Sequence, residues 1–155
     1  MSTRFEGKVA LVVGGANADE DRLLGFAGLS ALEIARDGGK VVIGDIDDEA
    51  GTRSVLKMKA SGVTADYVHM DVTSESDWQV AVDNTLSLHG RLDIMIMAAG
   101  IPDREGTIDS TEVDSWRRVM DVTNLGMFLG TRAVVEPMRN SGGGSIVLIS
   151  SMMAR

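Results

Sequence analysis

The sequence predicts an α/β fold, a doubly wound parallel sheet of about five strands with helices on both faces. Short apolar segments rich in Val and Ile alternate with helical patterns along the chain, which is typical of a parallel sheet covered on both sides. The first apolar segment leads into a glycine turn and a helix of small residues, and the second ends in an acidic residue, Asp45. We expect the strand order 3-2-1-4-5 and a single domain over residues 1–155.

The expected strands are short, and the expected helices lie between them. In the first helix Ala27, Ala31 and Ala35 recur every four residues, so one smooth face can lie close on the sheet. The strands cover Val9–Val13, Lys40–Gly44, Ala65–Met70, Leu92–Ala98 and Ser145–Ser150, and the helices cover Gly25–Arg36, Glu49–Ala60, Glu75–Leu88 and Thr111–Arg139.

Length and composition exclude several classes of protein. A chain of 155 residues suits one domain with its own core and leaves no room for a separate substrate domain. The net charge of -8 argues against nucleic acid and anionic membrane surfaces as partners. The chain has no cysteine, which excludes disulfides and thiolate metal sites and fits a reducing compartment. We find neither a signal peptide nor an apolar run near the ~20 residues of a membrane span, so we expect a cytoplasmic protein.

The segment Lys8–Asp45 is a dinucleotide-binding β-α-β unit of the Rossmann type. Glycines let the backbone approach a pyrophosphate, and the helix amino terminus stabilises its negative charge. A carboxylate about twenty residues further on accepts hydrogen bonds from the adenosine ribose, and Asp45 stands at that place. A 2′-phosphate would meet a like charge there, and Ile46 offers no compensating cation. We therefore expect NAD rather than NADP as the cofactor.

Five motifs in this order resemble the amino-terminal part of a short-chain dehydrogenase/reductase, and the resemblance covers essentially the whole chain. The motifs are the glycine loop (Val13-Gly14-Gly15-Ala16, then Gly25-Phe26-Ala27), Asp45, Asp71-Val72, Ala98-Ala99-Gly100 and Ser145–Ser151. The resemblance implies hydride transfer between NAD and an alcohol or ketone. It also implies the site residues: cofactor binding by Gly14, Gly25, Phe26, Asp45, Ile46, Asp71, Val72, Ala99 and Gly100, and catalysis by Ser151 and Asn124.

The family's catalytic Tyr-x-x-x-Lys pair is not found in these residues. The only tyrosine, Tyr67, is followed four residues later by Asp71, and the last lysine is Lys59. The tyrosine of that pair shuttles the proton and the lysine lowers its pKa. We therefore expect a truncated chain that is inactive alone. The alternative is a non-catalytic NAD-binding module or pseudoenzyme that acts through a partner.

The glycine loop is longer than in the family pattern. Gly14 and Gly25 are 11 positions apart, and the added segment includes Asp19-Glu20-Asp21-Arg22. One interpretation is a lid, or a site for a divalent cation that bridges to phosphate. The other, which we favour, is a solvated surface loop, because acidic runs usually face water. We expect no metal site.

The family's catalytic asparagine is displaced in this chain. The family pattern resembles Val-Asn-Leu-x-Gly, whereas residues 122–126 read Val-Thr-Asn-Leu-Gly and place Asn124 one residue late. One residue is ~100° of rotation on an ideal helix, which would swing the amide away from the site. A one-residue bulge in the helix would restore its direction. In the preceding motif Ala98 replaces the family's asparagine.

The last expected strand would be an open sheet edge. Apolar residues Ile146–Ile149 without a covering neighbour favour pairing with another chain, so we expect a homo-oligomer or association through this edge.

A third functional hypothesis, a flavodoxin-like signalling domain, is the one that the sequence supports least. Such a receiver needs a lysine at the end of its last strand, where Ser150 and Ser151 stand.

Overall fold

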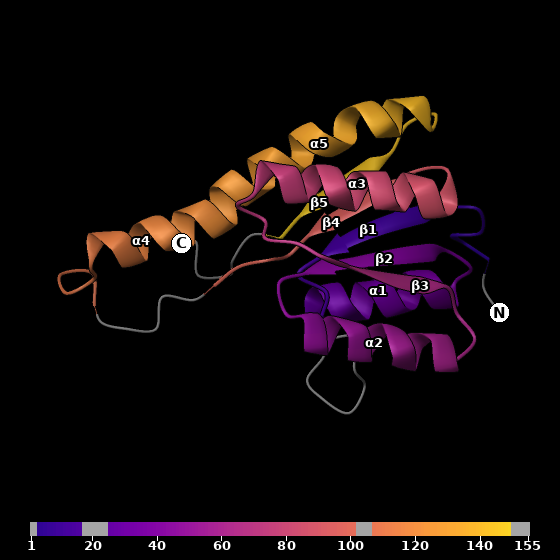
Figure 1. Ribbon diagram of the computed structural model, residues 1–155, viewed down its shortest axis with the longest axis horizontal. Coiled ribbons are helices and arrows are strands. Elements are labelled where there is room, and N and C mark those ends of the chain that lie inside the picture. Colours follow the sequence, from indigo (N-terminus) through magenta and orange to yellow (C-terminus); the bar gives the residue numbers. More distant parts are fainter. Residues whose placement is uncertain (1–2, 17–24, 102–106, 150–155) are drawn as a thin grey trace.

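The computed structural model describes residues 3–16, 25–101 and 107–149, which form a parallel sheet between two layers of helices (Figure 1). The elements in chain order are β1 Val9–Val13, α1 Phe26–Arg36, β2 Lys40–Asp45, α2 Asp48–Ala60, β3 Ala65–His69, α3 Glu75–His89, β4 Ile94–Met97, α4 Val113–Met120, a π-helical turn Asp121–Leu125, α5 Gly126–Asn140 and β5 Ser145–Leu148. The strand order is β3-β2-β1-β4-β5, which confirms the expected Rossmann-type topology.

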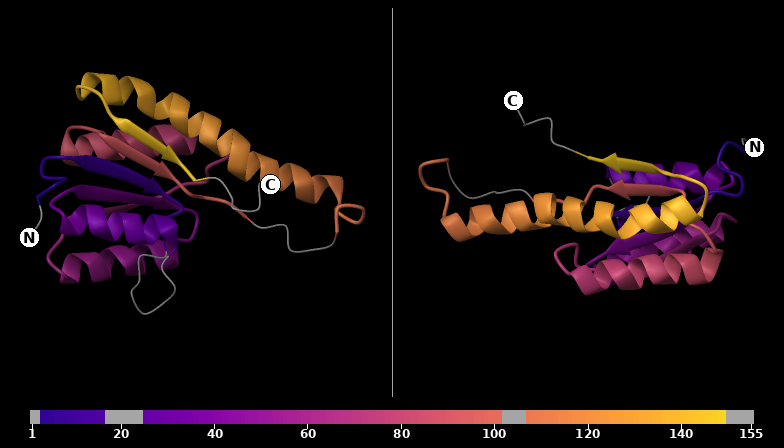
Figure 2. Two further views of the ribbon diagram at one scale, coloured as in Figure 1. Left: turned by 180° about the vertical axis from the view of Figure 1, so that it is seen from behind. Right: turned by 90° about the horizontal axis from the view of Figure 1, so that it is seen from above.

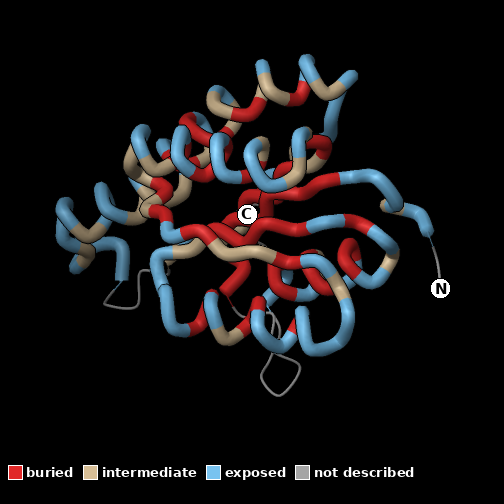
Figure 3. The backbone as a smooth tube through the Cα atoms, turned by 45° about the vertical axis from the view of Figure 1, so that its right-hand side comes forward, coloured by how far each residue is buried: buried red, intermediate tan, exposed pale blue. Residues whose placement is uncertain are grey.

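Two hydrophobic cores lie on the two faces of the sheet. Helices α1 and α2 cover one face, and α3 and α5 cover the other (Figure 2). The alanine face of α1 is buried as expected, which brings this helix close to β1 and β2. On the other face Trp78 is buried against Gly130, where an added Cβ would lie 2.5 Å from the indole ring. Burial is concentrated in the strands and in the inner faces of these helices (Figure 3).

Local sequence signals fix the helix ends. Asp47 caps α2 by accepting a hydrogen bond from the Ala50 amide at 2.9 Å. Ser74 caps α3 in the same way, accepting from the Asp77 amide at 3.3 Å. Gly90 ends α3 in the left-handed region, with φ of 76°, as glycine does at many helix carboxyl ends.

The expected single helix Thr111–Arg139 is wrong in one respect: the structure divides it into α4, the π-helical turn and α5. A π-helical turn contains one extra residue, so the two helices that flank it are rotated relative to a continuous α-helix. α5 buries residues against the sheet, whereas α4 buries none and extends beyond the sheet (Figure 1).

The strand β4 is shorter than the expected Leu92–Ala98, and the buried Asp93 lies just before its first residue. The carboxylate is 3% exposed and accepts a hydrogen bond from the Val9 amide at 3.0 Å. Arg91 binds it through two nitrogens, at 2.7 and 2.5 Å, and Lys8 lies 3.2 Å away. Burial alone would raise the pKa of Asp93, but Arg91, the Val9 amide and Lys8 hold it below its ordinary value. This cluster ties the beginnings of β1 and β4 together.

β5 is the edge strand of the sheet at the end opposite to β3, and it pairs with β4. The outer edge of β5 has no strand partner in the part of the chain that the structure describes. Val147 and Leu148 are 41% and 44% exposed. Among the described residues no helix has the length and apolar character needed to cross a membrane.

Candidate cofactor site

A cavity of about 810 Å³ lies at the carboxyl ends of the strands. It lies next to the junction of β1 and β4, where the strand order reverses direction. Crevices at this point of open α/β sheets are the usual ligand sites. Seven of the expected cofactor-binding residues line it: Gly14, Asp45, Ile46, Asp71, Val72, Ala99 and Gly100.

Gly14 forms the tightest approach in the cavity wall. Its φ is +79°, a conformation that side chains disfavour. A Cβ at this position would lie 2.6 Å from the Ala99 nitrogen and 2.8 Å from the Ala99 Cα. The Gly14 amide donates to the Gly44 carbonyl at 2.9 Å. The ends of β1 and β4 therefore meet through backbone atoms, and only glycine fits between them.

The Asp45 carboxylate is held at the edge of the cavity by two backbone amides. Its Oδ2 accepts from the Ala16 amide at 3.0 Å, and its Oδ1 accepts from the Asp47 amide at 3.2 Å. The buried Ser54 hydroxyl of α2 donates to the Ala16 carbonyl, so Ala16 is bound on both sides. The acidic insertion of the glycine loop follows Ala16 and lies outside the described residues.

Asp71 and Val72 form the wall beyond β3. Asp71 Oδ1 accepts from the amide and the hydroxyl of Thr73, at 2.9 and 2.8 Å. Its Oδ2 has no hydrogen-bond partner among the described residues. The indole nitrogen of Trp78 donates to the Val72 carbonyl at 2.9 Å, which fixes this wall on the buried core. The Asp71 amide, followed by the Ser74 hydroxyl, holds the pKa of Asp77 below its ordinary value.

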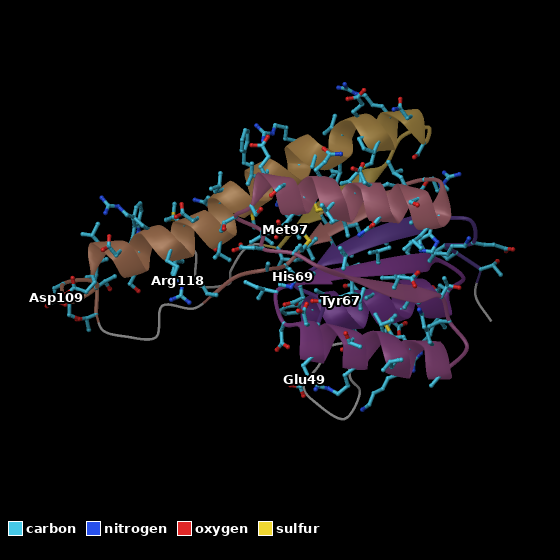
Figure 4. All side chains as sticks on the ribbon, viewed as in Figure 1. Glu49, Tyr67, His69, Met97, Asp109 and Arg118 are labelled. Atoms are coloured by element: carbon cyan, nitrogen blue, oxygen red, sulfur yellow. The ribbon has the colours of Figure 1, made fainter. Side chains whose placement is uncertain are left out.

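The opposite wall comes from α4 and the turn after it, and the sequence reasoning did not include it. The side chains on this wall are Asp114, Arg117, Arg118, Asp121, Val122 and Leu125. Arg117 pairs with Asp114 at 2.9 Å. Figure 4 shows Arg118 on α4, well away from the sheet. One helix face is indicated in the sequence by spacings of four, three and four residues, between Asp114, Arg118, Asp121 and Leu125. This pattern could have identified the residues of the wall.

A family model described as short chain dehydrogenase matches residues 8–155. The chain belongs to this family.

Two curated short-chain dehydrogenases illustrate the relationship. The 3-alpha-(or 20-beta)-hydroxysteroid dehydrogenase of Mycobacterium tuberculosis strain H37Rv is 43% identical over 152 residues, which cover 98% of this chain and 54% of that enzyme. The cyclopentanol dehydrogenase of Comamonas testosteroni is 36% identical over 149 residues, which cover 96% of this chain and 56% of that enzyme. The chain thus spans about half the length of the curated relatives that it matches.

A solved structure gives the same result for the fold. The short-chain type dehydrogenase/reductase from Mycobacterium ulcerans superposes with a TM-score of 0.86 at 28% sequence identity. The match covers 98% of this chain and 53% of that one. The sheet and helices described above are therefore those of a short-chain dehydrogenase.

Four of the short-chain dehydrogenase residues expected from the sequence are not among those that line the cavity. Gly25 caps α1, and Phe26 is 73% exposed in its first turn. Asn124 lies in the π-helical turn, is exposed, and donates to the Met120 sulfur at 3.5 Å. Ser151 lies outside the described residues. The roles of these four residues stay predictions.

Metal chemistry has no support from the described side chains. In the segments that the structure describes, His, Asp and Glu side chains nowhere gather in groups of three or more that could hold a metal ion.

Proposed function

We propose that this chain is the NAD-binding part of a short-chain oxidoreductase that transfers hydride between NAD and an alcohol or ketone. The observation that carries the proposal is the meeting of Gly14, Asp45, Asp71 and Val72 in one cavity at the switch point of the sheet. These residues come from three different strand ends. The hydroxysteroid and cyclopentanol dehydrogenases both take their names from alcohols, which supports an alcohol or ketone as the substrate class.

The residues around the cavity suit the adenosine half of the cofactor. The Asp45 carboxylate would accept hydrogen bonds from the ribose hydroxyls, since each oxygen uses one backbone amide and keeps further acceptor capacity. Asp71 Oδ2 would accept from the adenine amino group. Ile46 is 64% exposed and offers apolar area to the adenine ring. Gly14 would leave the backbone open to the sugar.

Asp45 also supports a preference for NAD over NADP. A 2′-phosphate would lie against this carboxylate, and two like charges at close range repel. The nicotinamide, when bound, supplies the position that gains or loses hydride. We propose Ser151 as the group that hydrogen-bonds the substrate oxygen, and Asn124 as the group that steadies a proton-relay water.

The 155-residue chain is proposed to bind the cofactor without turning over substrate. Its only tyrosine, Tyr67, lies on β3 and is not among the residues that line the cavity. The exposed position of Asn124 in the π-helical turn, outside the cavity lining, supports a second candidate function, an NAD-binding module that acts through a partner. Adding the carboxyl-terminal half of the mycobacterial relative and measuring ketone-dependent NADH oxidation separates the two. Restored turnover supports the oxidoreductase, and cofactor binding without turnover supports the module.

The first experiment is a titration of the folded chain with NADH and NADPH, followed by nicotinamide fluorescence. We expect NADH to bind at least about tenfold more tightly, a difference of ~1.4 kcal/mol. Asp45→Ser should weaken NADH binding by about tenfold or more, because hydrogen bonds to a charged group contribute ~1.5–3 kcal/mol. The same substitution should reduce the preference for NADH over NADPH. Asp83→Asn is the matched control, because it removes an exposed carboxylate of α3 that does not line the cavity. Equal affinity for the two cofactors, or no binding by a folded chain, would overturn the proposal.

A further inference from the structure

Tyr67 connects three elements beside the cofactor site. Its ring is half-buried and lies against Gly51 of α2, where an added Cβ would be 2.1 Å from Cε2. Its hydroxyl lies 2.8 Å from the carbonyl oxygen of Asp45, the last residue of β2. The same hydroxyl lies 2.7 Å from Oδ1 of Asp48, the first residue of α2. One phenol on β3 thus lies within hydrogen-bond distance of both ends of the turn that joins β2 to α2, and its single proton is shared between the two acceptors.

The surroundings keep this phenol protonated and in place. Burial and the hydrogen bond to Asp48 raise the pKa of Tyr67 well above its ordinary value, so it stays a hydrogen-bond donor. The bonds from Tyr67 and then His69 hold the pKa of Asp48 below its ordinary value. His69 Nδ1 lies 2.7 Å from the Asp48 oxygen that Tyr67 contacts. Figure 4 shows Tyr67 and His69 near each other on β3.

The turn that Tyr67 binds also orients the Asp45 carboxylate. Asp47, in the middle of the turn, donates its amide to Asp45 Oδ1 at 3.2 Å and caps α2 with its own carboxylate. If the ends of the turn move apart, this amide moves away from Asp45. The carboxylate would then lose one of the two backbone donors that orient it, and the three acidic side chains of Asp47-Asp48-Glu49 would lie near it with less restraint.

We propose that Tyr67 is a positioning residue of the cofactor site, whose hydroxyl holds the β2–α2 turn so that Asp45 faces the adenosine ribose. The proposal rests on the proposed function, because it assigns Tyr67 to the binding of the same cofactor. Tyr67 acts on NAD through Asp45. Its effect therefore falls on the ribose 2′-hydroxyl that Asp45 binds, and it contributes to the choice between NADH and NADPH.

The test is Tyr67→Phe, which keeps the ring against Gly51 and removes only the hydroxyl. We expect the affinity for NADH to fall about 3- to 10-fold, the range that one hydrogen bond of ~0.5–1.5 kcal/mol allows. Affinity for NADPH should change less than about twofold, because Asp45 does not favour that cofactor. Gly51→Ala displaces the ring without removing the hydroxyl and should narrow the preference for NADH in the same way.

A double-mutant cycle separates positioning from a general loss of stability. In an Asp45→Asn background, Tyr67→Phe should change NADH affinity less than about 1.5-fold, because the carboxylate that it positions is gone. Thr85→Val is the matched control, since it removes a buried hydroxyl that bonds the Ala81 carbonyl within α3. It should leave both affinities unchanged even where it lowers the melting temperature.

The outcomes are distinct for the two proposals. Equal NADH affinity for wild type and Tyr67→Phe, or a full additive loss in the Asp45→Asn background, overturns the role of Tyr67 and leaves the proposed function intact. Failure of the folded wild-type chain to bind NADH overturns the proposed function itself.

Discussion

Replacing Gly14 by alanine tests whether the cavity depends on a backbone contact between β1 and β4. The new Cβ would lie 2.6 Å from the Ala99 nitrogen and 2.9 Å from the Ala98 carbonyl carbon. These neighbours are backbone atoms, so they can give way only if the strand ends separate. The substitution should therefore affect both the free energy of unfolding and the cofactor affinity.

The size of the effect follows from two costs and one offset. A side chain in the left-handed region costs ~1–2 kcal/mol, and Gly14 has φ of +79°. Forcing extra volume into a packed contact costs a further ~1–3 kcal/mol. The lower entropy of alanine in the unfolded chain offsets about 0.4–1 kcal/mol. We expect Gly14→Ala to lower the free energy of unfolding by about 2–4 kcal/mol.

Gly7→Ala provides a matched control. Gly7 has φ of +73°, close to that of Gly14, but a Cβ added there would have no atom within 4 Å. It should therefore show the conformational cost alone, about 1 kcal/mol. Urea unfolding followed by circular dichroism measures both variants. For a slope of ~2 kcal/mol per molar, an extra 2 kcal/mol lowers the midpoint of Gly14→Ala by about 1 M relative to the control.

Cofactor titration completes the test. Gly14→Ala should weaken NADH binding by more than about tenfold, since the strand ends that face the ribose are displaced. Gly7→Ala should bind like the wild type. If the two variants lost the same stability and bound NADH equally well, the close contact between Gly14 and Ala99 would not matter and the reasoning would be refuted.

Two further predictions concern the sheet. Asp93→Ala should lower the free energy of unfolding by about 2–4 kcal/mol at pH 7, because it leaves the buried Val9 amide and two cations without their acceptor. The pKa of Asp93 is lower in the folded chain than the ~3.9 of an unfolded one, so its contribution is complete above about pH 5 and is lost as the pH falls through the folded pKa. Acid titration of stability should show a steeper fall for the wild type than for Asp93→Ala, and parallel curves would contradict this. Val147→Lys, on the exposed edge of β5, should shift the chain toward the monomer in light scattering, whereas an unchanged mass would argue against association through this edge.

The order of the strands could be predicted because each strand is a short apolar run with a turn signal at its end. The boundaries of β1 were predicted as observed. β4 is shorter than predicted: the Asp93 amide still donates to the Val9 carbonyl, but the regular strand begins at Ile94. The position of the site at the strand ends could also be predicted from the sequence, since parallel strands bring their carboxyl ends to one edge of the sheet. Gly14, Asp45 and Asp71 therefore meet, although they are far apart in the sequence.

The wall formed by α4 was not predicted, because its position depends on the direction that the helix takes after β4. The spacing of Arg118 and Asp121 identifies a helix face but not which part of the molecule lies opposite that face. The π-helical turn is a different case. The sequence allowed a one-residue bulge at Asn124 but nothing in it required one. In the structure Gly126, which follows the turn, packs closely against Met97 and Val72, where an added Cβ would be 3.0–3.2 Å from their side chains.

The two walls of the cavity are held in place by different amounts of packing. The wall at Gly14 and Ala99 has a fixed position, because backbone presses on backbone. The wall on α4 belongs to a helix that buries no residue and continues at its carboxyl end into the π-helical turn. Eight residues span about 12 Å, so a tilt of α4 by about 10° at the turn would move its far end by about 2 Å. A ligand that widens the cavity would therefore meet less resistance from α4, which buries no residue, than from the backbone contact at Gly14.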